Sequence, residues 1–215
     1  ATLSAALNIT VDDATQPRRR TQVVLAPLPP APPRPPAQPP YPPGAFVITS
    51  DADVRSALTT AAADSLLSLT LVLRPGARVA VGAGGNGAIP VPLGTTMYIE
   101  SEGEGATLDG GDGTQILKVR GTLHMRGVTL ANGRAQYGGG LFVHGGASVT
   151  LEQVLVANCT AHVCSGAADP TCSTFGSADG GALYIEHGGS VVMRDSLISN
   201  CVTLNEAGGA GATAR

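Results

Sequence analysis

Apolar and polar positions alternate at the start of the chain, over residues 3–11. Apolar side chains occupy every odd position of this stretch, namely Leu3, Ala5, Leu7, Ile9 and Val11. A period of two is typical of a β-strand with one buried face. We therefore predict a strand at 3–11, within an N-terminal arm that comprises residues 1–26.

Proline dominates residues 27–43, which read PLPPAPPRPPAQPPYPP. Proline fixes φ and has no backbone N–H, so this tract is predicted to form a polyproline II helix. At about 3.1 Å per residue the tract would span roughly 50 Å as a semi-rigid spacer. The alternative interpretation is a ligand for SH3 or WW modules.

Residues 44–75 combine strand and helix patterns. A short strand is predicted at 46–49, and Ser50 with Asp53 three residues later is arranged like a capping box at the start of a helix. The apolar stripe of this helix comprises Val54, Ala57, Leu58 and Ala61. An apolar run at 66–73 predicts a second strand. Such a strand-helix-strand unit can close the end of a solenoid, because terminal repeats must cover the hydrophobic stack.

Residues 76–215 contain an internal repeat. Residues 138–160 align without a gap over 180–202, at an offset of 42 positions, with nine of 23 residues identical. A weaker copy lies 26 positions before the first, and residues 95–108 resemble one more. Repeats of about this shorter length with several short strands each are typical of a parallel β-helix. The longer offset then predicts an insertion at 161–179.

Composition agrees with a body built from stacked strands. The chain has 29 glycines, seven aromatic residues (four Tyr, three Phe) and no Trp, and glycine suits the corners between short strands. Thirteen basic against sixteen acidic residues provide no basic surface for nucleic acid. No apolar run reaches about 18 residues, so we predict no transmembrane segment.

Two short motifs recur within the repeats. The first occupies residues 139–142 (Gly-Gly-Leu-Phe) and 181–184 (Gly-Ala-Leu-Tyr). The second occupies residues 155–158, 197–200 and 129–132, each ending in Asn. They resemble the Gly-Gly-Ala-Ile and Phe-x-x-Asn motifs of chlamydial polymorphic outer membrane proteins. The body likewise resembles the pectin-lyase-like superfamily. This resemblance implies an all-β fold, a right-handed parallel β-helix solenoid with one short N-terminal capping helix.

The proline tract joined to such a body resembles hydroxyproline-rich glycoproteins of green-algal walls and flagellar fibres. This resemblance implies prolyl hydroxylation and arabinosylation, together with an extracellular structural role. The modified residues would be Pro29, Pro30, Pro32, Pro33, Pro35, Pro36, Pro39, Pro40, Pro42 and Pro43.

Two sequons are further candidates for glycosylation, at Asn8 and Asn158. Asn8 lies on the polar face of the predicted arm strand, which favours glycosylation there. Asn158 aligns with Asn132 and Asn200 in the repeat. The alternative for Asn158 is therefore a buried structural ladder, in which the three side chains hydrogen-bond to the backbone at a corner.

The four cysteines indicate an oxidising compartment. Cys164 and Cys172 lie in the predicted insertion with seven residues between them, so we expect a local disulfide there. Cys159 and Cys201 occupy the same place in adjacent repeats, and they either form a disulfide or merely stack. A zinc site is not favoured, since zinc ligands usually have tighter spacings.

No catalytic set emerges from the aligned repeats. An inverting glycosidase needs two carboxyl groups about 6.5–9.5 Å apart, whereas the alignment places Glu152 beside Arg194, which we interpret as a surface ion pair. His144 and His187 are interpreted as exposed corner residues, and the segment 109–113 as a plain turn rather than a Ca²⁺ site. We therefore expect that the protein is not an enzyme and that it binds neither a cofactor nor a metal ion.

These patterns favour a structural subunit of an extracellular glycoprotein fibre or cell-surface coat. We expect self-association, in which the arm of one copy adds as a strand to a sheet edge or an open solenoid end of a neighbour. The alternatives are a carbohydrate-binding or polysaccharide-degrading β-helix protein, or a fragment of a surface adhesin.

Overall fold

The fold is described from a computed structural model. The residues described are 44–103, 105–162, 178–205 and 209–210. We refer to them as the body. The predicted arm strand, the proline tract and the cysteines Cys164 and Cys172 lie outside these residues, and the statements made about them above remain predictions. Asn8 and the candidate hydroxyprolines belong to the same group.

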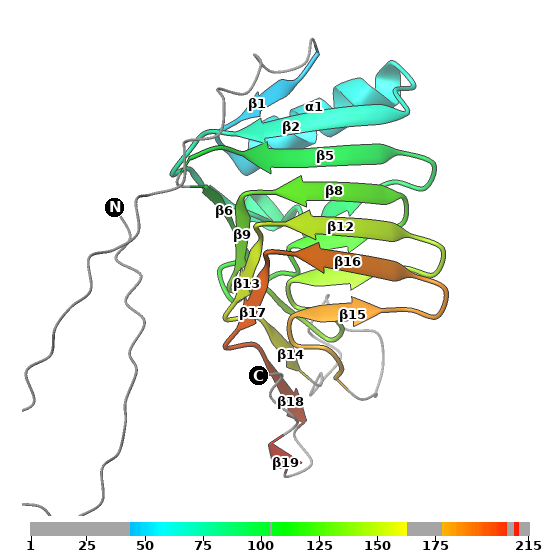
Figure 1. The fold of residues 1–215 in the computed structure, drawn as a ribbon. Helices are drawn as coiled ribbons and strands as arrows, with labels where there is room; N and C mark the ends of the chain where they lie inside the picture. Colours follow the sequence, from blue (N-terminus) through cyan, green and yellow to red (C-terminus); the bar gives the residue numbers. More distant parts are fainter. Residues whose placement is uncertain (1–43, 104, 163–177, 206–208, 211–215) are drawn as a thin grey trace, which may run out of the picture. The chain divides into compact units, whose positions relative to one another are not determined.

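A strand, a helix and a second strand open the body, as the sequence predicts. They are β1 (Phe46–Ile48), α1 (Asp51–Ala63) and β2 (Ser68–Leu73). Ser50 caps the helix by accepting a hydrogen bond from the Asp53 N–H, and the Asp53 side chain accepts one from the Ser50 N–H in return. The predicted capping box is thus confirmed. The helix packs against both strands and covers one end of the body (Figure 1).

Nearly all other described elements are short strands in four open sheets, within which the pairing is parallel except at β19. Sheet A contains, in spatial order, β1, β2, β5 (Thr96–Ser101), β8 (Thr122–Arg126), β12 (Ser148–Glu152) and β16 (Ser190–Arg194). Sheet B contains β3 (Arg78–Ala80), β6 (Ala106–Asp109), β9 (Val128–Ala131), β13 (Leu155–Ala157) and β17 (Leu197–Ser199).

The remaining strands belong to two four-stranded sheets. Sheet C contains β4 (Ile89–Val91), β7 (Leu117–Val119), β11 (Leu141–Val143) and β15 (Leu183–Ile185). Sheet D contains β10 (Arg134–Ala135), β14 (Thr160–His162), β18 (Val202–Asn205) and the antiparallel β19 (Gly209–Ala210). A short 3₁₀ turn, η1 (Ala83–Gly85), lies between β3 and β4.

The chain visits these sheets in a recurring order. From β2 onward it passes through sheet A and then sheet B. The first two passes continue directly to sheet C, and the third and fourth reach sheet C by way of sheet D. Each strand from β5 to β18, except β10 at the start of sheet D, pairs in parallel with the strand of the preceding pass, so successive passes stack in register (Figure 1). The fold is therefore all-β with parallel sheets, apart from one helix.

The predicted repeat offsets describe the actual strand register. The offset of 42 pairs Val149 with Val191, and the offset of 26 pairs Leu155 with Thr129. Ala161 pairs with Ala135 at the shorter offset, whereas Asp179 pairs with Tyr137 at the longer one. The extra residues therefore enter between 162 and 179, within the predicted insertion.

The core consists of aliphatic side chains that point inward from alternate strand positions. In sheet A, the column Leu71, Ile99, Met125 and Leu151 is at most 1% exposed. Full burial of such a side chain contributes about 1.5–3 kcal/mol. Stacked strands thus produce a continuous core without Trp and with few aromatic residues, as the composition suggests.

Candidate functional site

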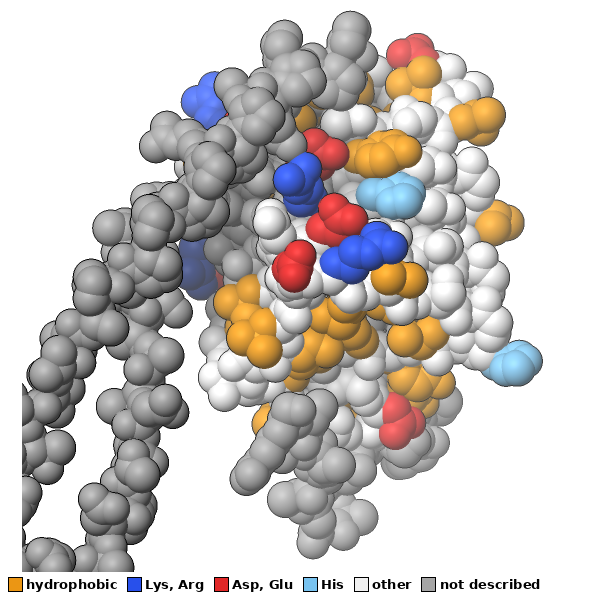
Figure 2. Space-filling model, in the orientation of Figure 1, with side chains coloured by type: hydrophobic (Ala, Val, Ile, Leu, Met, Phe, Trp, Pro, Cys, Tyr) orange, Lys and Arg blue, Asp and Glu red, His pale blue; other side chains and the backbone are white. Residues whose placement is uncertain are grey.

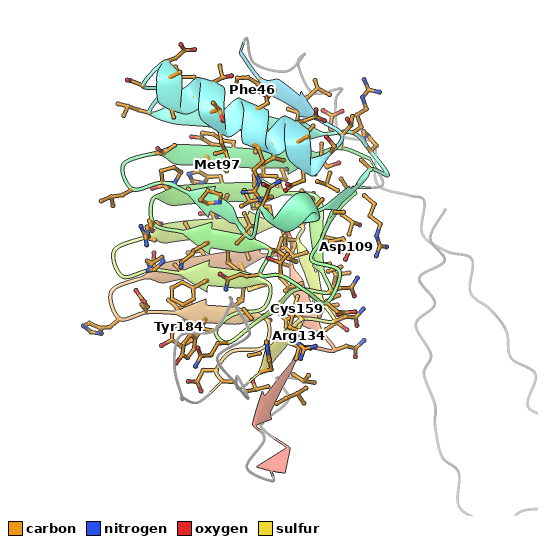
Figure 3. The ribbon with its side chains drawn as sticks, turned by 180° about the vertical axis from the view of Figure 1, so that it is seen from behind. Phe46, Met97, Asp109, Arg134, Cys159 and Tyr184 are labelled. Atoms are coloured by element: carbon orange, nitrogen blue, oxygen red, sulfur yellow. The ribbon has the colours of Figure 1, made fainter. Side chains whose placement is uncertain are left out.

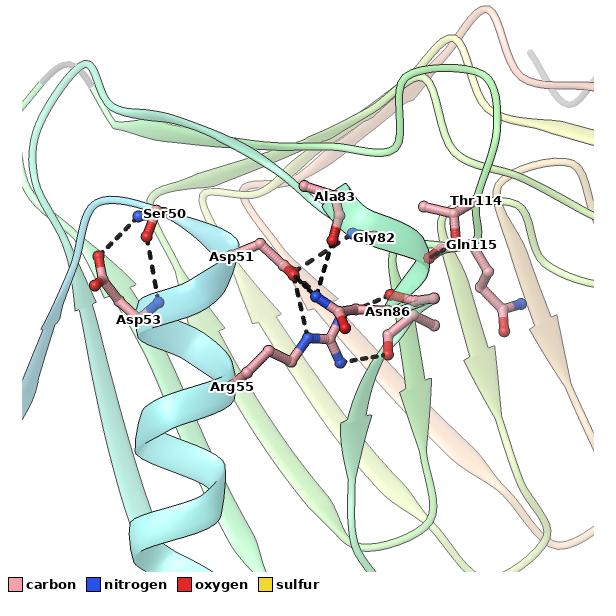
Figure 4. A network of polar contacts seen from close by, with 11 residues as sticks. Ser50, Asp51, Asp53, Arg55, Gly82, Ala83, Asn86, Thr114 and Gln115 are labelled. Carbon is pink, nitrogen blue, oxygen red and sulfur yellow. Dashed lines mark hydrogen bonds and ion pairs between the residues drawn. The ribbon is translucent and has the colours of Figure 1, made fainter.

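The end of the body that α1 covers is held by a buried carboxylate. Asp51 is 4% exposed and accepts hydrogen bonds from Arg55 Nη2 (3.1 Å), Asn86 Nδ2 (3.1 Å) and the Gly82 N–H (3.4 Å). Arg55 also donates to the backbone carbonyls of Gly87 (2.6 Å) and Ala88 (3.0 Å) (Figure 4). This network joins the start of the helix to the loop after β3, so its role is to close this end.

A pocket of about 350 Å³ lies beside this network, lined in part by Ser50, Arg78 and Asn86. Its polar side chains are already paired within the protein. Asn86 donates to Asp51, and Arg78 Nε donates to the Asp109 carboxylate (2.6 Å). The two charged side chains that line the pocket, Asp51 and Arg78, are thus each engaged in an ion pair within the protein.

The segment 109–113 is occupied by protein donors. Asp109 Oδ1 accepts from Asn132 Nδ2 (2.9 Å) and from the Gly111 N–H (3.0 Å), and Oδ2 pairs with Arg78. Burial opposes the charged form of Asp109, but these donors outweigh it and keep its pKa below the ordinary value. A carboxylate satisfied in this way favours the plain-turn interpretation over a Ca²⁺ site.

Opposite charges alternate down the outer face of sheet A. The facing residues Glu100, Arg126, Glu152 and Arg194 lie one per strand from β5 to β16. Arg194 Nη1 lies 3.3 Å from Glu152 Oε1, which confirms the predicted ion pair between repeats. Figure 2 shows red and blue side chains alternating along this face. We call these four residues the charge column.

The end of the body opposite α1 is not sealed in the same way. None of the described strands pairs with the outer edges of β15, β16 and β17, and we call these three strands the open end. Inward residues that are buried one pass earlier are partly exposed here. Ile185 is 44% exposed, whereas its partner Val143 is fully buried.

The other inward positions of the open end follow the same trend. Val191, Met193 and Ile198 are only half-buried, although their counterparts one pass earlier are at most 1% exposed. On the outer face, Val192 is 46% and Leu197 is 61% exposed. The body thus has one closed end and one apolar end with free strand edges.

An aromatic cluster lies on the outer face of sheet C. The ring centroids of Tyr137 and Tyr184 are 4.9 Å apart, and those of Phe142 and Tyr184 are 5.2 Å apart. Lys118 Nζ lies 5.6 Å from the centroid of the Phe142 ring. The three rings are half-buried, and Tyr184 lies at the opposite end of the body from Phe46 (Figure 3). We call Lys118 and these three residues the aromatic cluster.

A histidine and a carboxylate border the aromatic cluster. His144 packs against Phe142 with 4.5 Å between ring centroids, and its Nδ1 lies 3.2 Å from Glu186 Oε2. The hydrogen bond from the Gly145 N–H lowers the pKa of Glu186 despite partial burial, and the neighbouring His144 adds to this effect. The expectation of an exposed corner is therefore wrong for His144, which is half-buried, while His187 is exposed as predicted.

Cys159 and Cys201 are free thiols, so of the two alternatives the structure has stacking and not a disulfide. They face each other in adjacent passes, and the Cys159 N–H donates to Cys201 Sγ (3.3 Å). Their mutual hydrogen bond, together with burial, raises the pKa of Cys159, whereas the same bond lowers that of Cys201. Both thiols are buried, which makes them part of the core.

The predicted asparagine ladder is aligned as expected but is not buried. Asn132, Asn158 and Asn200 occupy one corner, where all three have φ close to +54°. Asn158 and Asn200 are exposed and Asn132 is half-buried. Asparagine suits this corner because it tolerates the left-handed conformation, not because it satisfies buried backbone groups. The sequon asparagine Asn158 is thus accessible.

The described residues contain no group of three or more His, Cys, Asp or Glu side chains placed to hold a metal ion.

No helix formed by the described residues is long and apolar enough to cross a membrane.

Comparison of the chain with protein-family models, curated proteins and solved structures finds no match. The resemblances noted in the sequence therefore rest on its motifs and on the parallel stacking of strands.

Three features described above were not predicted from the sequence. Asp51 was not expected to be buried, and Arg126 and Glu100 were not recognised as members of the charge column. Tyr137 joins the aromatic cluster from outside the strands. The offsets of 42 and 26 could have revealed the charge column, since they place its last three members in line. The repeat offsets do not predict the contact of Tyr137 with Phe142 and Tyr184.

Proposed function

We propose that the body is a right-handed parallel β-helix solenoid, and that the protein is a structural subunit of an extracellular fibre or cell-surface coat. The recurring order of sheets and the in-register parallel pairing support a solenoid. A crossover between parallel strands of one sheet is almost always right-handed.

The single observation that carries the structural role is the asymmetry of the two ends. Helix α1 covers one end, while the other presents free strand edges above half-buried inward residues such as Val191 and Met193. Exposed edges of this kind are templates for pairing with another chain. The sequence supplies a partner in the alternating strand predicted at 3–11, on a spacer of about 50 Å.

In this arrangement the arm of one copy adds to the open end of the next, and repetition produces a fibre. A contact between two different surfaces of identical subunits propagates without limit unless a rotation closes a ring. At the closed end α1 packs against β1 and β2, while β3 and β4 each keep one edge without a partner among the described strands. We favour arm exchange over direct end-to-end stacking of bodies because the alternating strand predicted at 3–11 suits an open edge.

Deleting residues 1–26 tests this proposal. The shortened protein should retain the circular dichroism spectrum and melting temperature of the body, but sediment as a monomer at concentrations where the full chain assembles. Electron microscopy of the two samples provides the second measurement. Fibres formed by the shortened protein would show that the arm is not the connecting element.

The extracellular setting is tested by the intact mass of the native protein. Glycans on the sequons and hydroxylation of the proline tract would raise the mass above the 21.5 kDa of the chain. A native mass equal to that of the bare polypeptide would contradict secretion through a glycosylating route.

Carbohydrate binding is the second candidate function, and the aromatic cluster is the observation that favours it. Aromatic faces stack on the apolar faces of sugar rings, and Lys118 would add a hydrogen-bond donor or pair with an acidic sugar. Titration with pectin-like oligosaccharides should broaden the resonances of Tyr137, Phe142 and Tyr184. Tyr184→Ala should abolish the effect, while Tyr98→Ala, a half-buried tyrosine on sheet A, should not.

A further inference from the structure

The charge column ends at Arg194 on the terminal strand β16, which has an oppositely charged neighbour on one side only among the described residues. Along sheet A each member faces an opposite charge on the next strand, about 4.8 Å away. Arg194 has Glu152 on one side, and no described residue faces it on the other. Its side chain is 63% exposed. A strand added to β16 would continue the alternation by placing an acidic residue over Arg194.

The inward positions of β16 impose a second condition. Val191 and Met193 point toward the core and are half-buried, so the added strand must place apolar side chains over both. In the predicted arm strand the odd positions are apolar, which leaves the even positions facing outward. The acidic residue must therefore stand at an even position, directly after an apolar residue.

One residue of the arm satisfies both conditions. Asp12 follows Val11 and stands at an even position. We propose that the arm of one copy docks parallel to β16 of the next in the register that places Asp12 over Arg194. This inference rests on the proposed function and deepens it.

The proposed register also agrees with the other columns of sheet A. It places Val11 over Met193 and Ile9 over Val191, which covers both inward positions with aliphatic side chains. Asn8 falls over Ser190, whose column contains only hydroxyl residues in the strands from β5 to β16. The sequon asparagine then faces outward, where a glycan does not obstruct the pairing.

Neighbouring registers fail on one condition or the other. A slip of one residue turns every apolar side chain of the arm outward. A slip of two residues in one direction places Asp13 over the inward Met193, and in the other direction it places Thr10 over Arg194. The charge column and the inward positions thus select a single register.

Charge reversal in the full-length protein tests the pairing. Asp12→Arg should weaken self-association about tenfold, because like charges would face each other across the contact. Asp13→Arg is the matched control, since the same change of charge one position later does not face Arg194. Sedimentation velocity measures the association, and the melting temperature of each variant checks that the body is intact.

Combining Asp12→Arg with Arg194→Asp should restore most of the lost association. Equal weakening by Asp12→Arg and Asp13→Arg, or a double variant no better than either single one, would overturn the register. If those results came with loss of assembly on deletion of residues 1–26, the proposed function would stand and only the register would be wrong. Assembly that survives the deletion would overturn both.

A cross-link gives an independent readout of the register. Thr10→Cys and Val192→Cys, introduced into separate copies that are then mixed, should form a disulfide between the two chains. The pair Asn8→Cys and Val192→Cys, which a slip of two residues would bring together, should not. A preference for the second pair, or a cross-link found only within single chains when both cysteines are in one copy, would contradict the proposal.

Discussion

At the scale of single residues, the corners between strands depend on backbone conformation. Asn132, Asn158 and Asn200 share a positive φ at one corner, and Gly127, Gln153 and Asp195 share one at the corner before it. The left-handed conformation costs most residues roughly 1–2 kcal/mol, but costs glycine almost nothing and asparagine little. Backbone strain, rather than burial, therefore accounts for the recurrence of Asn at this corner.

This account predicts opposite effects for two substitutions at Asn158. Asn158→Gly should leave the free energy of unfolding unchanged within about 0.5 kcal/mol, because glycine adopts the same φ without strain. Asn158→Val should lower it by about 1–2 kcal/mol, since a β-branched side chain clashes in this conformation. Urea denaturation of unglycosylated protein measures both. Similar losses for the two variants would indicate that the asparagine side chain itself stabilises the corner.

Asp109 predicts a specific dependence of stability on pH. Its pKa in the folded state lies below the ordinary value of 3.8, so folding favours the charged form. The stabilisation is fully present above the unfolded pKa and is lost as the pH falls through the folded pKa. Asp109→Asn should therefore cost about 1–2 kcal/mol at pH 7 and progressively less below about pH 4. A difference between wild type and variant that did not change between pH 7 and pH 3 would contradict this prediction.

At the scale of elements, the first helix combines a local and a long-range signal. The capping box of Ser50 and Asp53 lies on adjacent backbone and was predictable from the sequence. Asp51, one residue into the helix, instead binds Arg55, Asn86 and the Gly82 N–H. The element forms for local reasons, but its attachment to the end of the body depends on residues about 30 positions away.

Asp51→Ala should destabilise the closed end more than Asp53→Ala. Removal of the buried Asp51 carboxylate takes the charged partner from the half-buried Arg55 and an acceptor from the exposed Asn86, and breaking a buried charged pair costs about 3–5 kcal/mol. Asp53→Ala removes capping contacts at or near the surface and should cost less. Hydrogen exchange would report the loss as faster exchange across α1 and β1. Equal exchange in the two variants would argue against the buried network as the main attachment.

At the scale of the whole molecule, the two ends of the body differ. The helix seals one end, whereas the aliphatic column of sheet A reaches Val191 and Met193 only half covered. A body with two unlike ends needs no more than this asymmetry to assemble in one direction, provided that a strand from another copy fits the open end. The proposed role as a fibre subunit depends on the fit of such a strand at the open end.

A charged residue on the open end should therefore block assembly without unfolding the body. Val192→Lys places a lysine on the terminal strand β16, where charge opposes edge pairing. Thr150→Lys makes the same change in the same outward column on β12, whose two edges are already paired. Sedimentation should show a monomer for Val192→Lys and normal assembly for Thr150→Lys. Loss of assembly in both variants would point to the outer face of sheet A, not the edge, as the contact.

The sequence by itself determined the features that depend on local or periodic patterns. The helix with its capping box, the offsets of 42 and 26, and the ion pair of Glu152 with Arg194 could all be predicted. In-register parallel stacking makes these predictions work, because residues at equal places in successive repeats become neighbours. The same alignment correctly brought Asn132, Asn158 and Asn200 to one corner.

Only the tertiary structure decided how deeply these residues are buried and what else contacts them. It exposed Asn158, kept Cys159 and Cys201 as free thiols, and brought Tyr137 from outside the strands onto Phe142 and Tyr184. Burial depends on what covers a face, and such contacts depend on the path of the chain between corners. Neither quantity has a period along the sequence, so the pattern of apolar and polar residues does not contain it.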